Sequence, residues 1–355
     1  MTYCEVPIKH QWVEFAIQHN VQKFVLHGRV CGTRNLPNSI FSCRSLVKLE
    51  LFLHELVLSW PETIQLPNLK KLKLKFLLLS EMITGQDLFS NFPALEKLSM
   101  YFCNVAFFNI LSISSSRLME FTMSACLGME SCLIRLQTPS LSKFIYTCWD
   151  PRESVLQVPP CAFSLVVDSD DSCMCRGSPN ELSRTAIKLT RELFGTSYIT
   201  TGRWLIQYLS MVPNLPRQLA SVRYNHLLML NASLWPVARH VKTLMLLVSK
   251  CPILSVLSIN FVTPQGRIVN RGSGGYIADY DGGGDFVDLN DVTIENFGGN
   301  GTEMMLVRHL LARAPHLYIM RIKMNPLLDD IDVDLKIHHI LEYWKASPGA
   351  NIMFD

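Results

Sequence analysis

Apolar residues recur at regular intervals through the N-terminal part of this chain. Each copy of the pattern has three apolar positions, the second three residues after the first and the third two residues after the second. The first residues of the six copies are Val21, Leu46, Leu69, Leu95, Leu118 and Leu141. Successive copies therefore start 25, 23, 26, 23 and 23 residues apart. This near-constant interval indicates repeated structural units rather than isolated matches in an apolar chain.

A pattern of this form at an interval of 20–29 residues is typical of leucine-rich repeats, in which each repeat supplies a short strand and a returning segment. A single repeat cannot bury its apolar face alone, so neighbouring repeats stack around a continuous core. The predicted fold is therefore an α/β leucine-rich-repeat solenoid (horseshoe) with short parallel strands and irregular helical returns. Solenoids of this kind present broad binding surfaces.

The same pattern returns later in the chain, from Leu254, Leu289 and Leu317, at wider steps of 35 and 28 residues that indicate inserted loops. Between the two sets the pattern is irregular. Residues 180–194 predict a helix, because their apolar residues fall on one helical face after a Ser-Pro start signal. Over residues 202–248 we expect one strand and two helices.

These observations predict the organisation of the chain. We expect an N-terminal helical cap over 1–20, a repeat region over 21–265 that is irregular at 170–250, a Gly/Asp-rich loop over 266–288, a strand–helix–strand module over 289–325 that continues the solenoid, and a C-terminal cap over 326–355. The N-terminal cap is inferred from Trp12, Phe15 and Ala16, which lie at helical spacing. The helix of the strand–helix–strand module is expected from Glu303 to Ala314.

The composition favours a packed, intracellular protein. Of 355 residues, 48% are hydrophobic and 18% are charged, and the net charge of +3 is too small to indicate nucleic acid or a membrane as a partner. The N-terminus shows no apolar segment of a secretory signal, and no stretch reaches the roughly 18 apolar residues that a membrane helix needs. We therefore expect a cytoplasmic or nuclear location and interpret the 11 cysteines as reduced thiols.

Three polar or weakly polar residues have a predicted structural role at the ends of strands. Cys103 and Cys126 each follow the first leucine of their repeat by eight residues, where the longer form of the pattern expects Asn or Cys. Asn325 holds the same position after Leu317. We expect these side chains to turn inward and to bond backbone groups that are left unpaired as the strand ends.

Two segments resemble metal sites only superficially. Cys173 and Cys175 lie beside a run of aspartates, but a structural zinc site needs four ligands and no second Cys or His pair follows. The Gly/Asp-rich segment 279–285 resembles the start of a calcium loop, yet its twelfth position is Asn290 rather than a bidentate Glu. The same glycines lack the Lys-Ser/Thr of a phosphate-binding loop. We therefore expect loops and no metal.

The sequence offers few residues in an arrangement that could perform catalysis. His309, His338 and His339 lie in helical contexts without a partnered Cys, Ser or carboxylate at a useful spacing. No nucleophile–base pair can be named elsewhere, including the irregular middle of the chain. We therefore predict that the protein is not an enzyme and that it needs no cofactor.

The outward positions of the repeat strands are the candidate binding site. Strand side chains alternate, so if the second and third apolar residues of each pattern point inward, their neighbours face the concave surface of the solenoid. The candidate residues on this surface are Lys48, Glu50, Lys71, Lys73, Lys75, Lys97 and Tyr101. One interpretation is an ordinary solvated strand face. The other is a groove for an acidic partner protein.

An ordered set of short motifs resembles the leucine-rich-repeat region of plant F-box proteins of the FBD type. The motifs are LPNSIFSCRSL at 36–46, LPNLKKL at 66–72, LFSNFPALEKL at 88–98 and TPSL at 138–141. VTIENFGG at 292–299, followed by 303–317, is similar to the C-terminal FBD module of that family. The likeness covers most of residues 12–325 and is weakest between 170 and 250.

This resemblance implies a module that recognises substrate proteins for a cullin-based ubiquitin ligase. The clustered lysines of the candidate surface separately predict that the partner carries an acidic or phosphorylated segment. The family's N-terminal F-box, which docks the ligase adaptor, is not recognisable ahead of Trp12. The resemblance therefore implies that residues 1–355 alone do not bind the adaptor. The alternatives are a stand-alone leucine-rich-repeat scaffold or decoy with no ligase link, or a truncated gene model.

Overall fold

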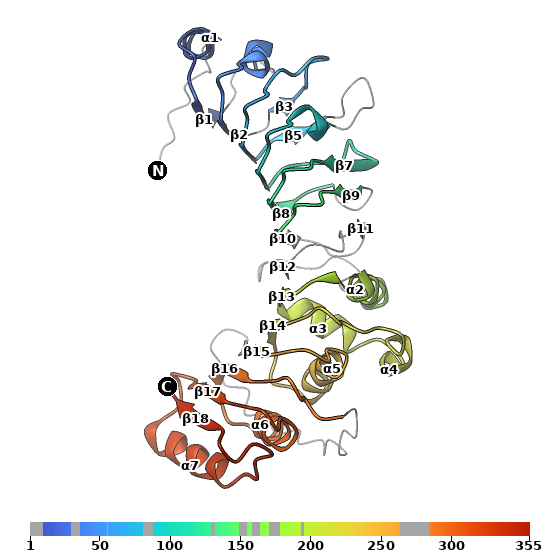
Figure 1. Ribbon diagram of the computed structural model, residues 1–355, viewed down its shortest axis with the longest axis vertical. Coiled ribbons are helices and arrows are strands. Elements are labelled where there is room, and N and C mark those ends of the chain that lie inside the picture. Colours follow the sequence, from blue (N-terminus) through green and yellow to red (C-terminus); the bar gives the residue numbers. More distant parts are fainter. Residues whose placement is uncertain are drawn as a thin grey trace. The chain divides into compact units, whose positions relative to one another are not determined.

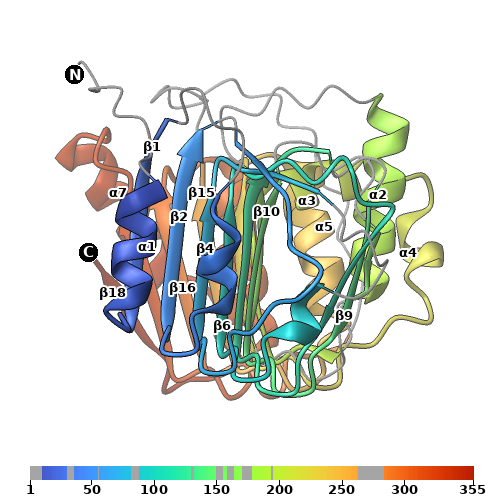
Figure 2. The same ribbon diagram turned by 90° about the horizontal axis from the view of Figure 1, so that it is seen from above.

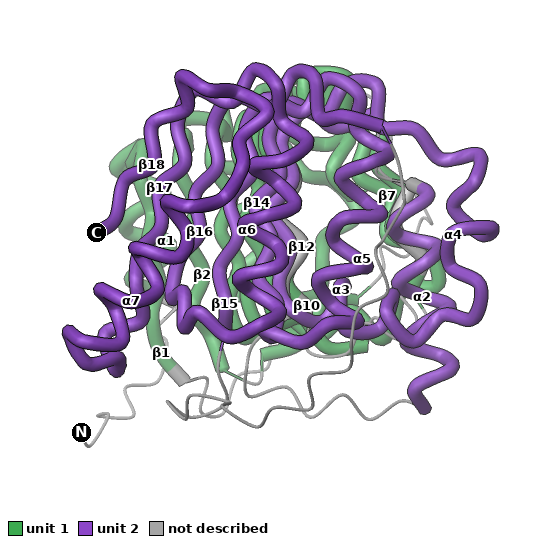
Figure 3. Tube along the Cα trace, turned by 90° about the horizontal axis from the view of Figure 1, so that it is seen from below, with its two compact units in different colours: residues 1–165, 169–177 green, residues 166–168, 178–355 purple. Residues whose placement is uncertain are grey.

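The structure of the protein is a computed structural model, which describes residues 10–29, 36–54, 56–80, 88–128, 132–148, 155–157, 164–169, 178–192, 195–262 and 284–355. The chain forms two compact units, coloured separately in Figure 3. Unit 1 comprises residues 1–165 and 169–177, and unit 2 comprises residues 166–168 and 178–355. Strand β12 (Ser164–Ser169) contributes residues to both units.

Unit 1 is a leucine-rich-repeat solenoid built on a parallel sheet. Its main strands follow one another along the chain and in space, in the order β1 (Lys23–Arg29), β2 (Lys48–His54), β4 (Lys71–Lys75), β6 (Lys97–Tyr101), β8 (Glu120–Cys126) and β10 (Lys143–Cys148). Figure 2 shows β2, β4 and β6 running side by side. Each repeat therefore adds one strand to the sheet, as the interval between the apolar patterns predicts.

The alternation of buried leucines with outward polar residues explains why these segments form strands. In β4, Leu72 and Leu74 are buried while Lys71, Lys73 and Lys75 lie on the opposite face, which is the alternation expected of a half-buried strand. Corresponding leucines in neighbouring repeats occupy the same register, so that Leu72 lies between Leu49 of β2 and Leu98 of β6. The core is a stack of identical positions, one from each repeat.

The first strand departs from this pattern. Phe24 and Leu26 of β1 are only half-buried, whereas the matching residues of the next repeats are fully buried. Among the described strands, β1 is the terminal one of its sheet and pairs only with β2, so a single described repeat neighbours its apolar side chains. The helix α1 (His10–Gln18) precedes it and buries Val13, whereas Trp12 and Phe15 are 54% and 63% exposed. The helix expected from the spacing of Trp12, Phe15 and Ala16 is thus present, with Trp12 and Phe15 on its exposed side.

The returning segments differ between the units. Where the structure describes the unit 1 returns, they are short turns and strands rather than α-helices. They are the 3-10 turns η1 (Asn38–Ser42) and η2 (Leu88–Asn91), the strand pair β3 (Val57–Leu58) and β5 (Leu78–Leu79), and the three-stranded sheet of β7 (Ile110–Ser114), β9 (Leu133–Gln137) and β11 (Val155–Gln157). Repeats of 23 to 26 residues leave little chain for a helix after the strand and its two turns. The predicted helical returns occur instead in unit 2.

Unit 2 is also a parallel solenoid, with longer returns. Its strands are ordered β13 (Tyr198–Thr201), β14 (Met229–Leu234), β15 (Val256–Phe261), β16 (Asp291–Phe297), β17 (Ile319–Met324) and β18 (Asn351–Phe354). Its helices are α2 (Pro179–Glu192), α3 (Arg203–Leu209), α4 (Leu215–Gln218), α5 (Ala238–Val248), α6 (Gly301–Arg313) and α7 (Asp330–Leu341). Helices α2, α3, α5 and α6 lie along one side of the strands (Figure 1).

Most elements expected in unit 2 are present at the predicted places. The helix expected over 180–194 is α2, and the helix expected from Glu303 to Ala314 is α6. The region 202–248 holds the strand β14 and the helices α3 and α5, together with the single turn α4. The apolar pattern does not predict strand β18, because residues 351–354 carry no leucine pattern and follow a Pro-Gly pair that favours a turn.

The residues at the strand ends turn inward as predicted. Cys103 and Cys126 are buried, and their thiols lie 3.5 and 3.7 Å from the carbonyl oxygens of Tyr101 and Ser124. Asn325 is buried and its side-chain oxygen accepts a hydrogen bond of 2.9 Å from the backbone N–H of Leu327. Burial raises the pKa of the Cys126 thiol, which therefore stays protonated and packs as a small apolar group.

Within the described residues, no helix combines the length and the apolar character needed to cross a bilayer. The described His, Cys, Asp and Glu side chains do not gather in groups of three that could hold a metal ion. Cys173, Cys175, the segment 279–283 and most of the Gly/Asp-rich loop predicted over 266–288 lie outside the described residues.

Candidate functional site

The candidate residues on β2, β4 and β6 share the face of the unit 1 sheet that points away from its core. The strand register places Lys71 between Lys48 and Lys97, and it places Lys73 beside Glu50. Lys75 pairs with Phe52 on one side and Tyr101 on the other. We call this surface the lysine face and define it as Lys48, Glu50, Phe52, Lys71, Lys73, Lys75, Lys97 and Tyr101. The prediction from strand alternation thus identifies neighbours in space.

Two lysines at the sides of the face have carboxylate partners. Lys48 Nζ lies 2.6 Å from Glu50 Oε1 on its own strand, and Lys97 forms an ion pair with Glu120 of β8. Partial burial alone would raise the pKa of Glu50, but the hydrogen bond from Lys48 and the charges of Lys73 and Lys23 outweigh it and lower the pKa. The hydrogen bond from Lys97 is the main reason why the pKa of Glu120 is also lowered. Both carboxylates are therefore ionised at neutral pH.

The three lysines of β4 have a different environment. Among the described residues, no carboxylate lies within ion-pair distance of Lys71, Lys73 or Lys75. Neighbouring strands of a sheet are about 5 Å apart, so these ammonium groups lie close to other cations of the face. Like charges at this spacing repel one another, and an anion placed over β4 would relieve the repulsion.

Aromatic rings accompany the unpaired ammonium groups. Lys73 Nζ lies 5.2 Å from the ring centre of Phe52 and 5.3 Å from that of Tyr101, which come from the two flanking strands. Lys75 Nζ lies 4.8 Å from the ring centre of Phe76 and 5.6 Å from that of Phe102. A cation within about 6 Å of a ring is attracted to the negative face of the π system. The rings therefore hold the lysine side chains in place without neutralising their charge.

Phe76 and Phe102 were missed by sequence reasoning. Both follow the last residue of their strand with positive φ angles of 61° and 52°, and their rings stack 5.1 Å apart. A large residue seldom adopts this left-handed conformation, and nothing in a single repeat predicts it. The available signal is comparative: Phe76 and Phe102 occupy equivalent positions in consecutive repeats, directly after Lys75 and Tyr101.

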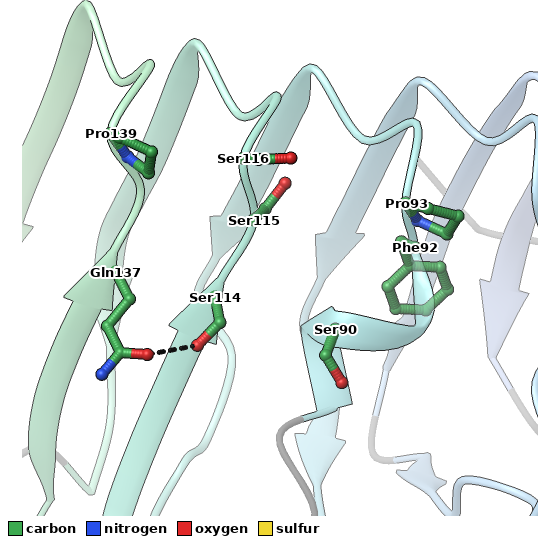
Figure 4. Close-up of a pocket in the computed structure, with 8 residues that line it drawn as sticks. All are labelled: Ser90, Phe92, Pro93, Ser114, Ser115, Ser116, Gln137 and Pro139. Carbon is green, nitrogen blue, oxygen red and sulfur yellow. Dashed lines mark hydrogen bonds between the residues drawn. The ribbon is translucent and has the colours of Figure 1, made fainter.

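Unit 1 also contains a serine-lined cleft of about 380 Å³, shown in Figure 4. Its lining residues are Ser90, Phe92, Pro93, Ser114, Ser115, Ser116, Gln137 and Pro139. Ser114 Oγ donates a hydrogen bond of 3.0 Å to Gln137 Oε1. The lining contains hydroxyl groups but no His, Lys, Asp or Glu to activate one as a nucleophile. The run of serines at 114–116 and the prolines at matching loop positions are the sequence signals for this cleft.

The three histidines considered for catalysis are structural or surface residues. His309 is half-buried in α6, and burial followed by the charge of Arg313 lowers its pKa. His338 and His339 are exposed on α7, where His338 Nε2 lies 3.5 Å from Glu342 Oε1 one turn away. All three histidines belong to unit 2.

Parallel strands at a regular interval, stacked leucines and an inward Cys or Asn after the strand define a leucine-rich-repeat protein. Residues 10–158 match the family model described as FBD-associated F-box protein At5g56370, LRR repeats. This part of the chain is thus similar to the leucine-rich-repeat region of FBD-associated F-box proteins.

Two curated relatives from Arabidopsis thaliana agree with this assignment. The putative FBD-associated F-box protein At5g56700 is 36% identical over 91 residues, which is 25% of this chain and 23% of the relative. The F-box protein At4g09920 is 29% identical over 133 residues, which is 36% of this chain and 42% of the relative. The aligned segments span less than half of either relative.

Proposed function

We propose that this chain is a non-catalytic protein-binding module whose lysine face holds an acidic or phosphorylated segment of a substrate protein for a ubiquitin ligase. The coarse function, protein binding by a repeat module, agrees with the leucine-rich-repeat match. The link to a ligase is supported by the names of the F-box relatives. The domain organisation proposed from the sequence, with an FBD-like module over 289–325, fits the same family.

The observation that carries the proposal is the charge of β4. Lys71, Lys73 and Lys75 present three ammonium groups on one strand, and two of the three are held between aromatic rings. A solvated strand face has no need of such positioning, because water screens and satisfies mobile lysines. Fixed ammonium groups lose less side-chain freedom when they bind an anion, so the face is preorganised for carboxylate or phosphate.

The experiment measures binding of a defined acidic probe. A fluorescein-labelled peptide of alternating Glu and Ser is titrated with the full chain, and fluorescence anisotropy reports binding. A phosphoserine version and a Gln-for-Glu version test the two kinds of anion and the neutral case. We expect binding of both anionic peptides, weakened about tenfold or more as salt rises from about 50 mM to about 300 mM.

Charge reversal locates the binding site. The variant K71E/K73E/K75E should lose binding of the anionic peptides. The matched control R184E/K188E/R217E reverses three exposed cations of unit 2 and should bind as the wild type does. Equal loss of binding in both variants would show that net charge causes the effect. Unchanged binding by K71E/K73E/K75E would show that the lysine face is an ordinary solvated surface and does not bind the peptide.

The ligase link needs a separate test, because a scaffold or decoy with no ligase link would bind the same peptides. An F-box fused ahead of Trp12 should bring the ligase adaptor and the acidic peptide into one complex. Residues 1–355 without the fusion serve as the control and are expected not to bind the adaptor. Tight adaptor binding by this control would show that docking occurs elsewhere in the chain.

A further inference from the structure

The helix α7 of unit 2 has apolar residues on both of its faces. Its inner face contains the buried Ile340 and the half-buried Val333 and Ile337, at the spacing of one helical face. Its outer face carries Ile331 and Leu335, one turn apart, which are 75% and 65% exposed. A helix that is apolar on both sides is normally covered on both sides. In Figure 1, α7 lies at the C-terminal end of unit 2, and it contacts α6.

The outer face of α7 is also acidic. Asp330 and Asp334 flank Ile331 and Leu335 in the sequence and are exposed. Asp332 has a cation nearby, since Lys336 Nζ lies 3.7 Å from its carboxylate, but no cation lies within ion-pair distance of Asp330 or Asp334 among the described residues. A surface that covers this face must therefore supply apolar contact and positive charge together.

The lysine face of unit 1 has this combination. Its unpaired ammonium groups on β4 lie beside Phe52 and Tyr101, whose half-buried rings add apolar surface. We propose that α7 of one chain docks on the lysine face of a second copy of this chain. The inference rests on the proposed function, since it names α7 as one acidic segment that the lysine face accepts.

The dimensions of the two surfaces agree. Asp330 and Asp334 are four residues apart on a helix, a rise of about 6 Å. Lys71, Lys73 and Lys75 are two residues apart on β4, a spacing of about 7 Å along the strand. Two carboxylates of the helix can therefore reach two unpaired ammonium groups of β4 at once, while Ile331 and Leu335 contact the rings. An acidic amphipathic helix laid on a complementary surface is a recurring mode of recognition.

The contact is tested by the oligomeric state of the full chain. Sedimentation velocity over a range of roughly 1 to 100 µM should show species heavier than the monomer at about 50 mM salt, and these should dissociate as salt rises. The variants K71E/K73E/K75E and D330K/D334K should each be monomeric. Mixing the two variants should restore association, because the reversed face then meets a reversed helix. The control R184E/K188E/R217E should associate as the wild type does.

A second variant removes only the apolar contribution. I331S/L335S changes two exposed side chains, so it should fold normally and associate about tenfold or more weakly than the wild type. A wild-type chain that is monomeric at every concentration, or a mixture of charge-swapped variants that stays monomeric, would overturn the proposal. Binding of the Glu-Ser peptide by a chain that is monomeric throughout would leave the proposed function standing and refute this inference alone.

Discussion

The buried side chain of Glu303 makes the stability of a helix N-terminus depend on pH. It is the third residue of α6, and its carboxylate accepts a hydrogen bond of 3.1 Å from the backbone N–H of Asn300, whose own side chain caps the helix in return. Only 2% of Glu303 is exposed, and this burial raises its pKa to about 7 despite the N–H groups and the Lys336 charge that oppose the shift. The carboxyl group therefore titrates near neutral pH.

Gly299 makes this arrangement possible. Its φ is +67°, a conformation that favours glycine, and a Cβ at this position would lie 2.2 Å from Cδ of Lys336. The Lys336 side chain of α7 thus passes directly over the backbone that leads into α6. This contact, together with the buried Ile340, fastens α7 to unit 2 by its inner face.

We predict that Glu303→Gln stabilises the protein above neutral pH. The raised pKa means that the wild type gains stability from this group below pH 4.5 and loses it as the pH rises through about 7. Glutamine keeps the capping-box acceptor but carries no charge, so the gain should reach roughly 1–3 kcal/mol at alkaline pH. Urea unfolding at pH 5 and pH 8.5 measures it, and an equal effect at both values would contradict the explanation.

The buried side chain of His240 should have the opposite effect to Glu303 on the pH dependence of stability, because it destabilises the protein at low pH. It is fully buried in α5 beside Trp235, neither ring nitrogen has a hydrogen-bond partner among the described residues, and burial followed by the charge of Arg239 lowers its pKa to about 4. Its contribution to stability is present above pH 6.5 and is lost as the pH falls through about 4.

We therefore predict that His240→Leu makes the protein less sensitive to acid. The variant removes a group that must gain a proton on unfolding below pH 6.5, a contribution on the order of 3 kcal/mol at most. The difference in unfolding free energy between wild type and variant, measured from pH 7 to pH 4, should shift in favour of the variant. A constant difference over this range would show that His240 is not the responsible group.

At the scale of elements, the unit 1 strands owe their position to leucine stacking. Leu72 is 1% exposed and contacts its equivalents in the repeats on either side. Deleting a buried leucine side chain costs its transfer free energy and leaves a cavity, because neighbouring residues relax only in part.

Leu72→Ala should therefore lower the unfolding free energy by roughly 2–5 kcal/mol. Urea denaturation followed by circular dichroism measures the loss. Lys75→Ala, on the opposite face of the same strand, is the matched control and should change stability by less than about 1 kcal/mol. An unchanged midpoint for Leu72→Ala would be incompatible with the stacked core.

At the scale of the whole molecule, each unit has its own stack of buried residues. In unit 2, Leu257 of β15 lies between Leu230 of β14 and Val292 of β16, and all three are buried. Repeats contact their immediate neighbours, so the effect of a core deletion should be greatest in adjacent strands and decline along the array.

Hydrogen exchange should show this locality. Leu72→Ala should reduce amide protection most in β2, β4 and β6, and Leu257→Ala should reduce it most in β14, β15 and β16. Peptide-resolved mass spectrometry can separate these strands. A uniform loss of protection across both units in each variant would indicate one cooperative core instead of two stacks.

The amino-acid sequence is enough to predict the solenoid class, the positions of the main strands and the face on which the lysines lie. This was possible because strand side chains alternate with a period of two, so that Leu72 and Leu74 inside require Lys71, Lys73 and Lys75 outside. The inward position of Cys103 is predicted by the repeat pattern, which places an Asn or Cys eight residues after the first leucine.

The surroundings of those residues depend on how the repeats pack against one another. The pairing of Lys97 with Glu120, the positive φ of Phe76 and the exposure of Ile331 depend on neighbouring strands and helices that lie far away along the chain. The apolar period locates strands but does not specify which side chains meet across them. Such contacts arise from the register of stacked repeats and from the segments left without a covering neighbour, because burial and charge are properties of the packed surface.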